Sequence, residues 1–182
     1  MTGLAAWLLA LPFAVASPAP TTAQLRELMR DLPNFATELA YEFCPQLING
    51  ETVLENNPDL IALGFAATPE TGGNVDFPGF ARLGQTRKDG YVAVGGISGK
   101  ICEVTASGPE AAMALRQLRA GISGLGLNFE ADPANSGPGD KGTVEAFQMK
   151  YSATGQVQLR LIHTTTGDGA PSASFQIIIQ EK

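Results

Sequence analysis

The sequence predicts an α+β fold: a single domain in which a curved antiparallel sheet of about six to seven strands packs against two main helical segments. Two regions show apolar residues at helical spacing, and each is followed by segments in which apolar and polar residues alternate. Such one-faced alternation is typical of an antiparallel sheet that is covered on one side only. The 21 glycines and 12 prolines among 182 residues favour many turns between short elements.

The N-terminal segment has the pattern of a signal peptide. The first 16 residues carry no charged side chain, and their apolar run is too short to span a bilayer as a helix. Ala14-Val15-Ala16 matches the small-x-small pattern of a signal peptidase site. We therefore expect a signal peptide of residues 1–16 and a single periplasmic or secreted α+β domain of residues 17–182, without stable membrane insertion after cleavage. An uncleaved N-terminal anchor is the alternative.

Cys44 and Cys102 are the two cysteines of the chain. In an oxidising compartment, a lone pair of cysteines is more often a structural bridge than a redox or metal site. The two residues do not form a C-x-x-C motif and have no histidine near them in sequence, so zinc and thioredoxin-like chemistry have little support. We predict a disulfide between Cys44 and Cys102 that joins the helical layer to the sheet. Two separate buried thiols are the alternative.

The first helical region is predicted in two pieces. Thr21 opens a match to a capping box, and apolar residues at helical spacing follow it. Pro33 is expected to interrupt this helix, because proline removes a backbone donor and clashes with the preceding turn. The second piece continues until Pro45 and Gly50, which are expected to close it.

Alternation with a period of two begins after an irregular stretch that holds a short helical turn near residues 59–63. Residues 80–88 and 91–97 flank the Asp89-Gly90 dipeptide, which suits the positive φ angles of a type I′ hairpin turn. A third strand is expected at residues 100–106. The chain up to residue 106 therefore contributes three strands to the sheet.

The second helical region starts at a capping box, Ser107-Gly108-Pro109-Glu110, and is expected to end at Gly121. A further short strand is predicted at residues 125–130, followed by a loop rich in glycine and proline. Three alternating segments close the sequence and are predicted as strands at residues 143–152, 156–164 and 172–180.

His163 is the only histidine and lies on the apolar side of the predicted strand 156–164. As a general base at the mouth of a pocket, it would use Asp168 or a nearby serine as its partner. The serines considered are Ser152, Ser172 and Ser174. The alternative is a histidine at the edge of the core that bonds a backbone carbonyl. The absence of a Gly-x-Ser-x-Gly elbow in the sequence favours this second interpretation.

Other chemistries have less support in the sequence. Glu38 and Glu42 share a helix face and would form the carboxylate pair of a hydrolase, but a solvated surface pair is the alternative. One histidine and scattered carboxylates give no metal-binding spacing, and the glycine-rich stretches lack the residue order of a phosphate loop. We therefore expect neither a metal nor a cofactor.

The charge of the chain argues against a nucleic-acid partner. It carries 12 basic and 18 acidic side chains, for a net charge of -6, whereas nucleic-acid binders need a basic surface that displaces counterions. Four basic residues nevertheless gather on the first hairpin and the strand after it: Arg82, Arg87, Lys88 and Lys100. They form either a modest positive strip or a solvent face that pairs with acidic residues of the same chain.

These observations favour an exported, non-catalytic binding or accessory domain whose ligand is an unidentified protein or small molecule. A secreted hydrolase that uses His163 or a carboxylate pair is one alternative. A structural or assembly subunit that pairs through an exposed sheet edge is another.

Overall fold

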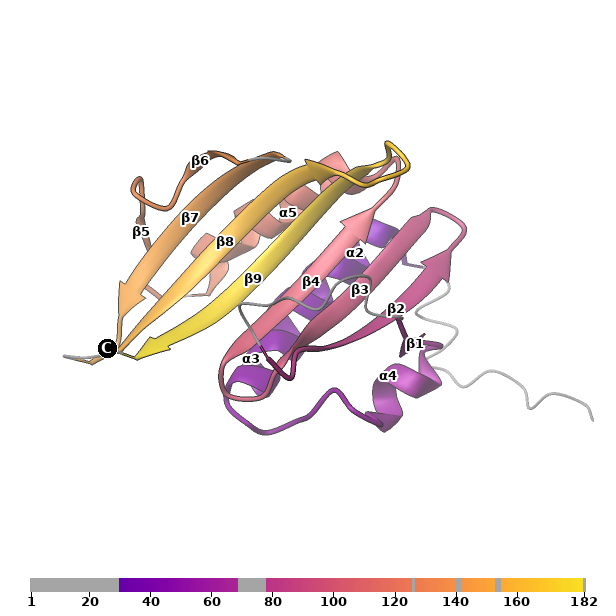
Figure 1. Cartoon of the computed structure of the whole chain (residues 1–182), viewed down its shortest axis with the longest axis horizontal. Coiled ribbons are helices and arrows are strands. Elements are labelled where there is room, and N and C mark those ends of the chain that lie inside the picture. The colour runs from indigo at the N-terminus through magenta and orange to yellow at the C-terminus, as the bar shows by residue number, and fades with distance from the viewer. Residues whose placement is uncertain (1–29, 69–77, 126, 140–141, 153–154, 182) are drawn as a thin grey trace, which may run out of the picture.

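A computed structural model describes residues 30–68, 78–125, 127–139, 142–152 and 155–181. The predicted signal peptide, its cleavage site and the predicted helix start at Thr21 lie outside these residues. Within them the chain forms one open antiparallel sheet (Figure 1). Its strands are β1 (Ala66–Ala67), β2 (Ala81–Arg87), β3 (Gly90–Ile97), β4 (Ile101–Ser107), β5 (Glu130–Ala131), β6 (Gly137–Gly139), β7 (Gly142–Lys150), β8 (Gly155–Thr165) and β9 (Pro171–Glu181). They lie in the order β1-β2-β3-β4-β9-β8-β7-β5, and β6 pairs with β7.

Helices cover one face of this sheet (Figure 1). The first covering element is a continuous helical run made of α2 (Leu32–Glu38), a π-helical turn η1 (Leu39–Phe43) and α3 (Cys44–Ile48), which lies behind β3 and β4. The second is α5 (Ala111–Gly124), which lies behind β8 and β9 and also contacts α2. The short α4 (Pro58–Ala62) lies beside the β1 and β2 edge. In the described part of the chain, no helix is long and apolar enough to cross a membrane.

The predicted α+β class, with one antiparallel sheet and two main helical segments, is confirmed. The six long strands, β2 to β4 and β7 to β9, occupy the six segments in which the sequence alternates clearly. The remaining strands are two- and three-residue pieces. The strand predicted at residues 125–130 overlaps β5 only at Glu130, so this prediction is largely wrong, and β6 lies inside the predicted loop. Both pair with β7.

The core lies between the helices and one face of the sheet. A row of apolar side chains that crosses the sheet illustrates it: Val94, Val104, Phe175 and Leu161 are directly paired on neighbouring strands and at most 1% exposed. The ring of Tyr41 packs at 5.2 Å from that of Phe175, and its hydroxyl donates to the Leu118 carbonyl. Each large apolar side chain that is fully buried contributes about 1.5–3 kcal/mol.

The disulfide between Cys44 and Cys102 is present, and it joins the helical layer to β4 as predicted. Both residues are 0% exposed and belong to the core. The bridge closes a loop with a sequence separation of 58 residues. Chain-entropy arguments give a bridge of this span about 4 kcal/mol of stabilisation through the unfolded state.

Two prolines act differently from the prediction. Pro33 lies in the first turn of α2, behind an N-cap at Asp31, where a missing N–H costs nothing, so the second helical piece begins before the proline and not after it. Most of the first predicted piece lies outside the described residues. Pro45 does not end the helical run, which continues to Ile48. The π-helical turn accounts for this, because the Cys44 N–H bonds the Leu39 carbonyl five residues back and the register shifts just before the proline.

The first hairpin turns one residue earlier than predicted. Arg87 pairs with Gly90, so Lys88 and Asp89 form the connection. The Asp89 carboxylate accepts hydrogen bonds from the Leu32 N–H at 2.8 Å and from Arg87 Nε at 3.1 Å. Gly90 is needed for close approach, because it has a φ of 145° and a Cβ there would overlap the Ser107 carbonyl oxygen.

The capping box predicted at Ser107 is wrong. Ser107 is the last residue of β4 and its Oγ donates to Ser172 Oγ at 2.9 Å, while the N-cap position of α5 is Glu110, without a side-chain capping bond. Gly121 does not end the helix either. A Cβ at Gly121 would overlap the Tyr41 ring, so this glycine lets the two helices approach closely inside α5.

We predict that Gly121→Ala destabilises the protein by about 1–3 kcal/mol, although alanine is the better helix former, because the added methyl group would have to displace the partly buried Tyr41 ring. Urea unfolding measures the change. Gly124→Ala is the matched control, since it is in the same helix and a Cβ there meets no atom within 4 Å. Equal stabilities for the two variants would contradict the close contact between the helices.

Candidate functional site

The face of the sheet opposite the helices carries polar side chains, because strand residues alternate between the two faces. A groove with a volume of about 610 Å³ lies on this face, over β3, β4 and β9. The turn between β8 and β9 (residues 166–170) and the loop residue Gly108 also line it. We call this depression the open-face groove.

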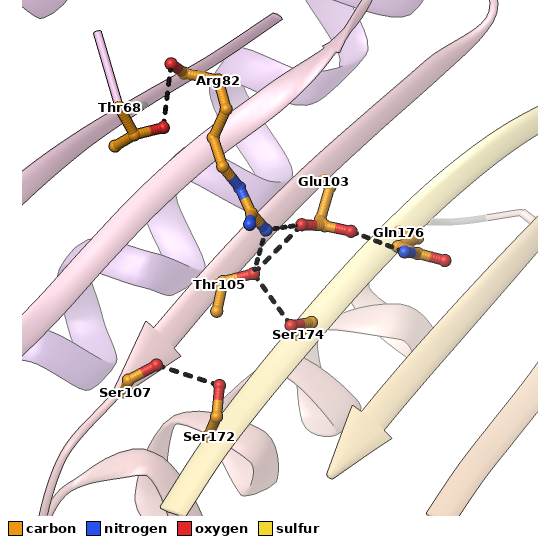
Figure 2. A network of polar contacts seen from close by, with 8 residues as sticks. All are labelled: Thr68, Arg82, Glu103, Thr105, Ser107, Ser172, Ser174 and Gln176. Atoms are coloured by element: carbon orange, nitrogen blue, oxygen red, sulfur yellow. Dashed lines mark hydrogen bonds and ion pairs between the residues drawn. The ribbon is translucent and has the colours of Figure 1, made fainter. Parts of the chain in front are cut away.

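An ion pair forms one end of the groove. The Arg82 guanidinium on β2 donates to Glu103 Oε1 and, at 3.2 Å, to Thr105 Oγ1, both on β4 (Figure 2). Gln176 Nε2 on β9 donates to the other oxygen of Glu103 at 2.6 Å. The Glu103 side chain is 12% exposed, and it accepts hydrogen bonds from groups on both sides of its own strand.

Arg82 reaches β4 because the strand between them carries a glycine. Arg82, Gly95 and Glu103 are directly paired on β2, β3 and β4, and strands two apart are separated by about 10 Å. Gly95 places no side chain in the path of the guanidinium. A Cβ there would lie 2.6 Å from the Phe80 ring, which therefore packs directly on the Gly95 backbone. On the other side of β2, the carbonyl of Arg82 accepts from the Thr68 N–H at 3.2 Å.

The electrostatics of this end reflect partial burial. Burial lowers the pKa of Arg82, with a smaller opposing effect from Tyr91, and Arg82 Nε is buried without a hydrogen-bond partner. Burial raises the pKa of Tyr91, and the positive charge of Arg82 opposes that shift. The hydroxyl of Tyr91 lies where a Cβ of Gly84 would be, so this glycine makes room for the Tyr91 side chain, which lines the groove.

Two pairs of hydroxyl groups form the floor of the groove where β4 meets β9. Thr105 Oγ1 and Ser174 Oγ lie 2.8 Å apart, and Ser107 Oγ donates to Ser172 Oγ at 2.9 Å (Figure 2). Both pairs are directly opposite each other in the strand register. Ser172 and Ser174 are 2% and 8% exposed, so these hydroxyls are largely withdrawn from water and satisfy one another.

The other end of the groove is the turn between β8 and β9. The Thr166 hydroxyl donates to Asp168, and the Ala170 N–H donates to the same carboxylate at 3.3 Å. The hydrogen bond from Thr166, followed by that from Ala170, holds the pKa of Asp168 below its ordinary value. Asp168 therefore fixes the shape of the turn and presents a charged carboxylate at the rim.

The segment between β5 and β6 covers part of the polar face on β8. Asp132, in the segment between β5 and β6, accepts from Asn135 Nδ2 at 2.7 Å and from Gln158 Nε2 on β8 at 3.2 Å. Gln158 is 1% exposed and also accepts from Arg160 Nε at 2.9 Å. Gln158 is therefore closed off from solvent, and it is not among the residues that line the open-face groove.

His163 and Asp168 lie at different places. His163 is exposed on β8, where it pairs with Thr143 and Ala173, and it is not among the residues that line the groove, whereas Asp168 is. Of the serines considered as partners, Ser172 and Ser174 line the groove. A catalytic role for His163 or Asp168 stays a prediction.

The other candidate residues lie away from the groove or are paired. Glu38 forms an ion pair with Arg30, while Glu42 is exposed on the π-helical turn. Arg87 bonds Asp89 and the Arg30 carbonyl, and it stacks on the Phe35 ring at 5.1 Å. With Arg82 paired to Glu103 as well, Arg82 and Arg87 belong to the alternative in which the basic residues pair within the chain.

The alternation in the sequence assigns Glu103, Thr105 and Gln176 to the polar side of their strands, but nothing in it brings them together. Their meeting depends on β4 lying beside β9, which no local pattern encodes.

Comparisons with protein-family models, curated proteins and solved structures found no match. Among the described residues, no group of three or more histidine, cysteine, aspartate or glutamate side chains is arranged to hold a metal ion.

We predict that Glu103→Ala destabilises the protein by about 1–3 kcal/mol, because the substitution leaves donors on Arg82, Thr105 and Gln176 without their acceptor. Arg82→Ala should lower the free energy of unfolding less in the Glu103→Ala variant than in the wild-type protein, since the two side chains act as one unit. Urea unfolding of the single and double variants gives the coupling. Glu110→Ala, which removes an exposed carboxylate without a capping bond, is the control and should change stability little. Strict additivity would argue against the network.

Proposed function

We propose that residues 17–182 form an exported, non-catalytic binding domain and that the open-face groove holds its ligand. The observation that carries this proposal is the groove itself, a concave site whose polar groups are fixed in advance by bonds among themselves. Its volume of about 610 Å³ lies within the range of roughly 300–1,000 Å³ that is typical of small-molecule sites. Fixed side chains reduce the entropy that a ligand has to offset on binding.

The partners of the hydroxyl groups support binding rather than catalysis. A serine or threonine nucleophile needs an adjacent base that is free to take its proton. Ser172 and Ser174 bond to other hydroxyls. Thr105 also contacts Glu103 at 3.3 Å, but that carboxylate already accepts from Arg82 and Gln176. A secreted hydrolase remains the alternative that the binding experiment has to exclude.

Export is supported by the N-terminal pattern together with the Cys44–Cys102 disulfide, because such bridges persist in oxidising compartments. We predict that the exported protein begins at Ser17 and contains no free thiol. Intact-mass measurement of the protein recovered outside the cytoplasm, before and after alkylation under denaturing conditions, tests both points. A chain that retains Met1 would contradict cleavage, and two alkylated cysteines would contradict the bridge.

The binding role is tested by titrating isotope-labelled protein with four ligand classes: neutral sugars, carboxylates, amines and short peptides. We expect saturable shifts of the amide signals of Thr105, Ser107, Ser172 and Ser174 in two-dimensional NMR spectra. Ala170→Trp, which fills the groove from its rim and keeps the backbone bonds of Ala170, should abolish the shifts. Ala120→Trp, at an exposed site on α5, is the matched control and should bind normally.

Three outcomes of this titration would overturn the proposal. Chemical conversion of a ligand during the measurement would identify an enzyme. Binding that survives Ala170→Trp would locate the site elsewhere. No shift of the groove signals with any of the four classes would leave the groove without a role in binding small ligands or peptides.

A further inference from the structure

The charges around the open-face groove argue against a strongly charged ligand. Its lining includes one cationic side chain, Arg82, and two carboxylates, Glu103 and Asp168. Arg82 is paired with Glu103, so an incoming anion would compete with a carboxylate that is held from three sides. Asp168 lies at the opposite end and would repel an anion. A cation would find one exposed carboxylate at the rim, already bonded by Thr166 and Ala170, and no acidic floor.

Most of the hydrogen-bonding side chains that line the groove are hydroxyl groups. Six hydroxyl side chains besides the Tyr91 phenol line it: Thr105, Ser107, Thr164, Thr166, Ser172 and Ser174. A hydroxyl group is one donor and two acceptors at once, so Ser107 and Ser172, which bond each other, use only part of their capacity. Thr105, by contrast, already contacts Arg82, Glu103 and Ser174. A ligand hydroxyl has the same dual character and can bond to such a pair without leaving a donor facing a donor. The groove is thus matched to a ligand that carries several neighbouring hydroxyls.

Tyr91 adds an apolar surface to this polar lining. Its side chain lines the groove and reaches from β3 toward β2, where Gly84 leaves space for the hydroxyl end of the ring. An aromatic ring with a polar tip offers a face for C–H groups and a hydroxyl for a hydrogen bond. A rigid ring compound with hydroxyls at its edge and C–H groups on its faces uses both features at the same time.

We infer that the open-face groove binds a neutral saccharide of one or two rings. This inference rests on the proposed binding function and names its ligand class. The Tyr91 ring contacts the C–H face of a sugar, and the partly exposed hydroxyls of Ser107, Thr164 and Thr166 bond its hydroxyls. The paired Arg82 and Glu103 supply one donor and one acceptor group at the end of the groove.

The test uses labelled wild-type protein titrated with cellobiose, maltose, lactose and N,N′-diacetylchitobiose up to ~10 mM, a range that detects millimolar affinity. We expect at least one disaccharide to shift the signals of Thr105, Ser107, Ser172 and Ser174 saturably. Its affinity should change less than about 2-fold on adding ~0.5 M sodium chloride, since no net charge is paired. Glucuronate and glucosamine, the charged single-ring controls, should bind at least ~10-fold more weakly than glucose.

Two substitutions of Tyr91 test whether the aromatic ring contributes to sugar binding. Tyr91→Leu, which keeps an apolar side chain but removes the ring, should weaken binding by about 10-fold. Tyr91→Phe, the matched control, keeps the ring and should weaken it by less than about 3-fold. Folding of both variants is checked by their dispersed amide spectra.

The outcomes distinguish this inference from the proposed function. If none of the sugars shifts the groove signals while carboxylates, amines or peptides do, the saccharide class is overturned and the binding role is left intact. Equal binding by Tyr91→Leu and wild type would also overturn it. Silence of every class would overturn both.

Discussion

The burial of one face of the sheet beneath two helical segments is the constraint on which the remaining structure depends. Val94, Val104 and Phe175 on that face are 0% exposed, and a strand side chain that points toward the helices sends its neighbours to the other face. A shift of one residue in register would exchange the two sets completely. The polar composition of the groove is therefore fixed by the same alternation that fills the core.

Local rules predicted the fold as far as local physics determines it. The alternating segments, the short turn at α4 and the pairing of the two cysteines follow from periodicity, proline placement and compartment chemistry. The errors fell where a distant part of the chain decides. Gly121 is kept for the Tyr41 ring, Gly90 for the Ser107 carbonyl, and Ser107 turns from the helix start to Ser172. In each case the deciding atom is more than 15 residues away.

The candidate site was less predictable than the fold because it depends on which strands are neighbours. Alternation assigns Glu103 and Gln176 to a polar face, yet their contact requires the pairing of β4 with β9, which are separated by α5 and four other strands. Arg82 acts across an intervening strand, and only the glycine at position 95 hints at this. The sequence drew attention to His163 because it is unique, whereas the groove is built from residues that are common on any polar strand face.

The groove lies on the seam between β4 and β9, and this position makes its existence depend on a long-range strand pairing. The β2 to β4 strands and the β7 to β9 strands can each form from near neighbours, but the seam joins residues about 70 positions apart, such as Thr105 and Ser174. Contacts of that separation form slowly, since the chain first has to close a long loop. A ligand held across the seam would clasp the two halves of the sheet together, and its binding energy would add directly to the free energy that keeps them joined. In such a protein, ligand binding would raise the free energy of unfolding, so the stability of the fold would depend on ligand concentration.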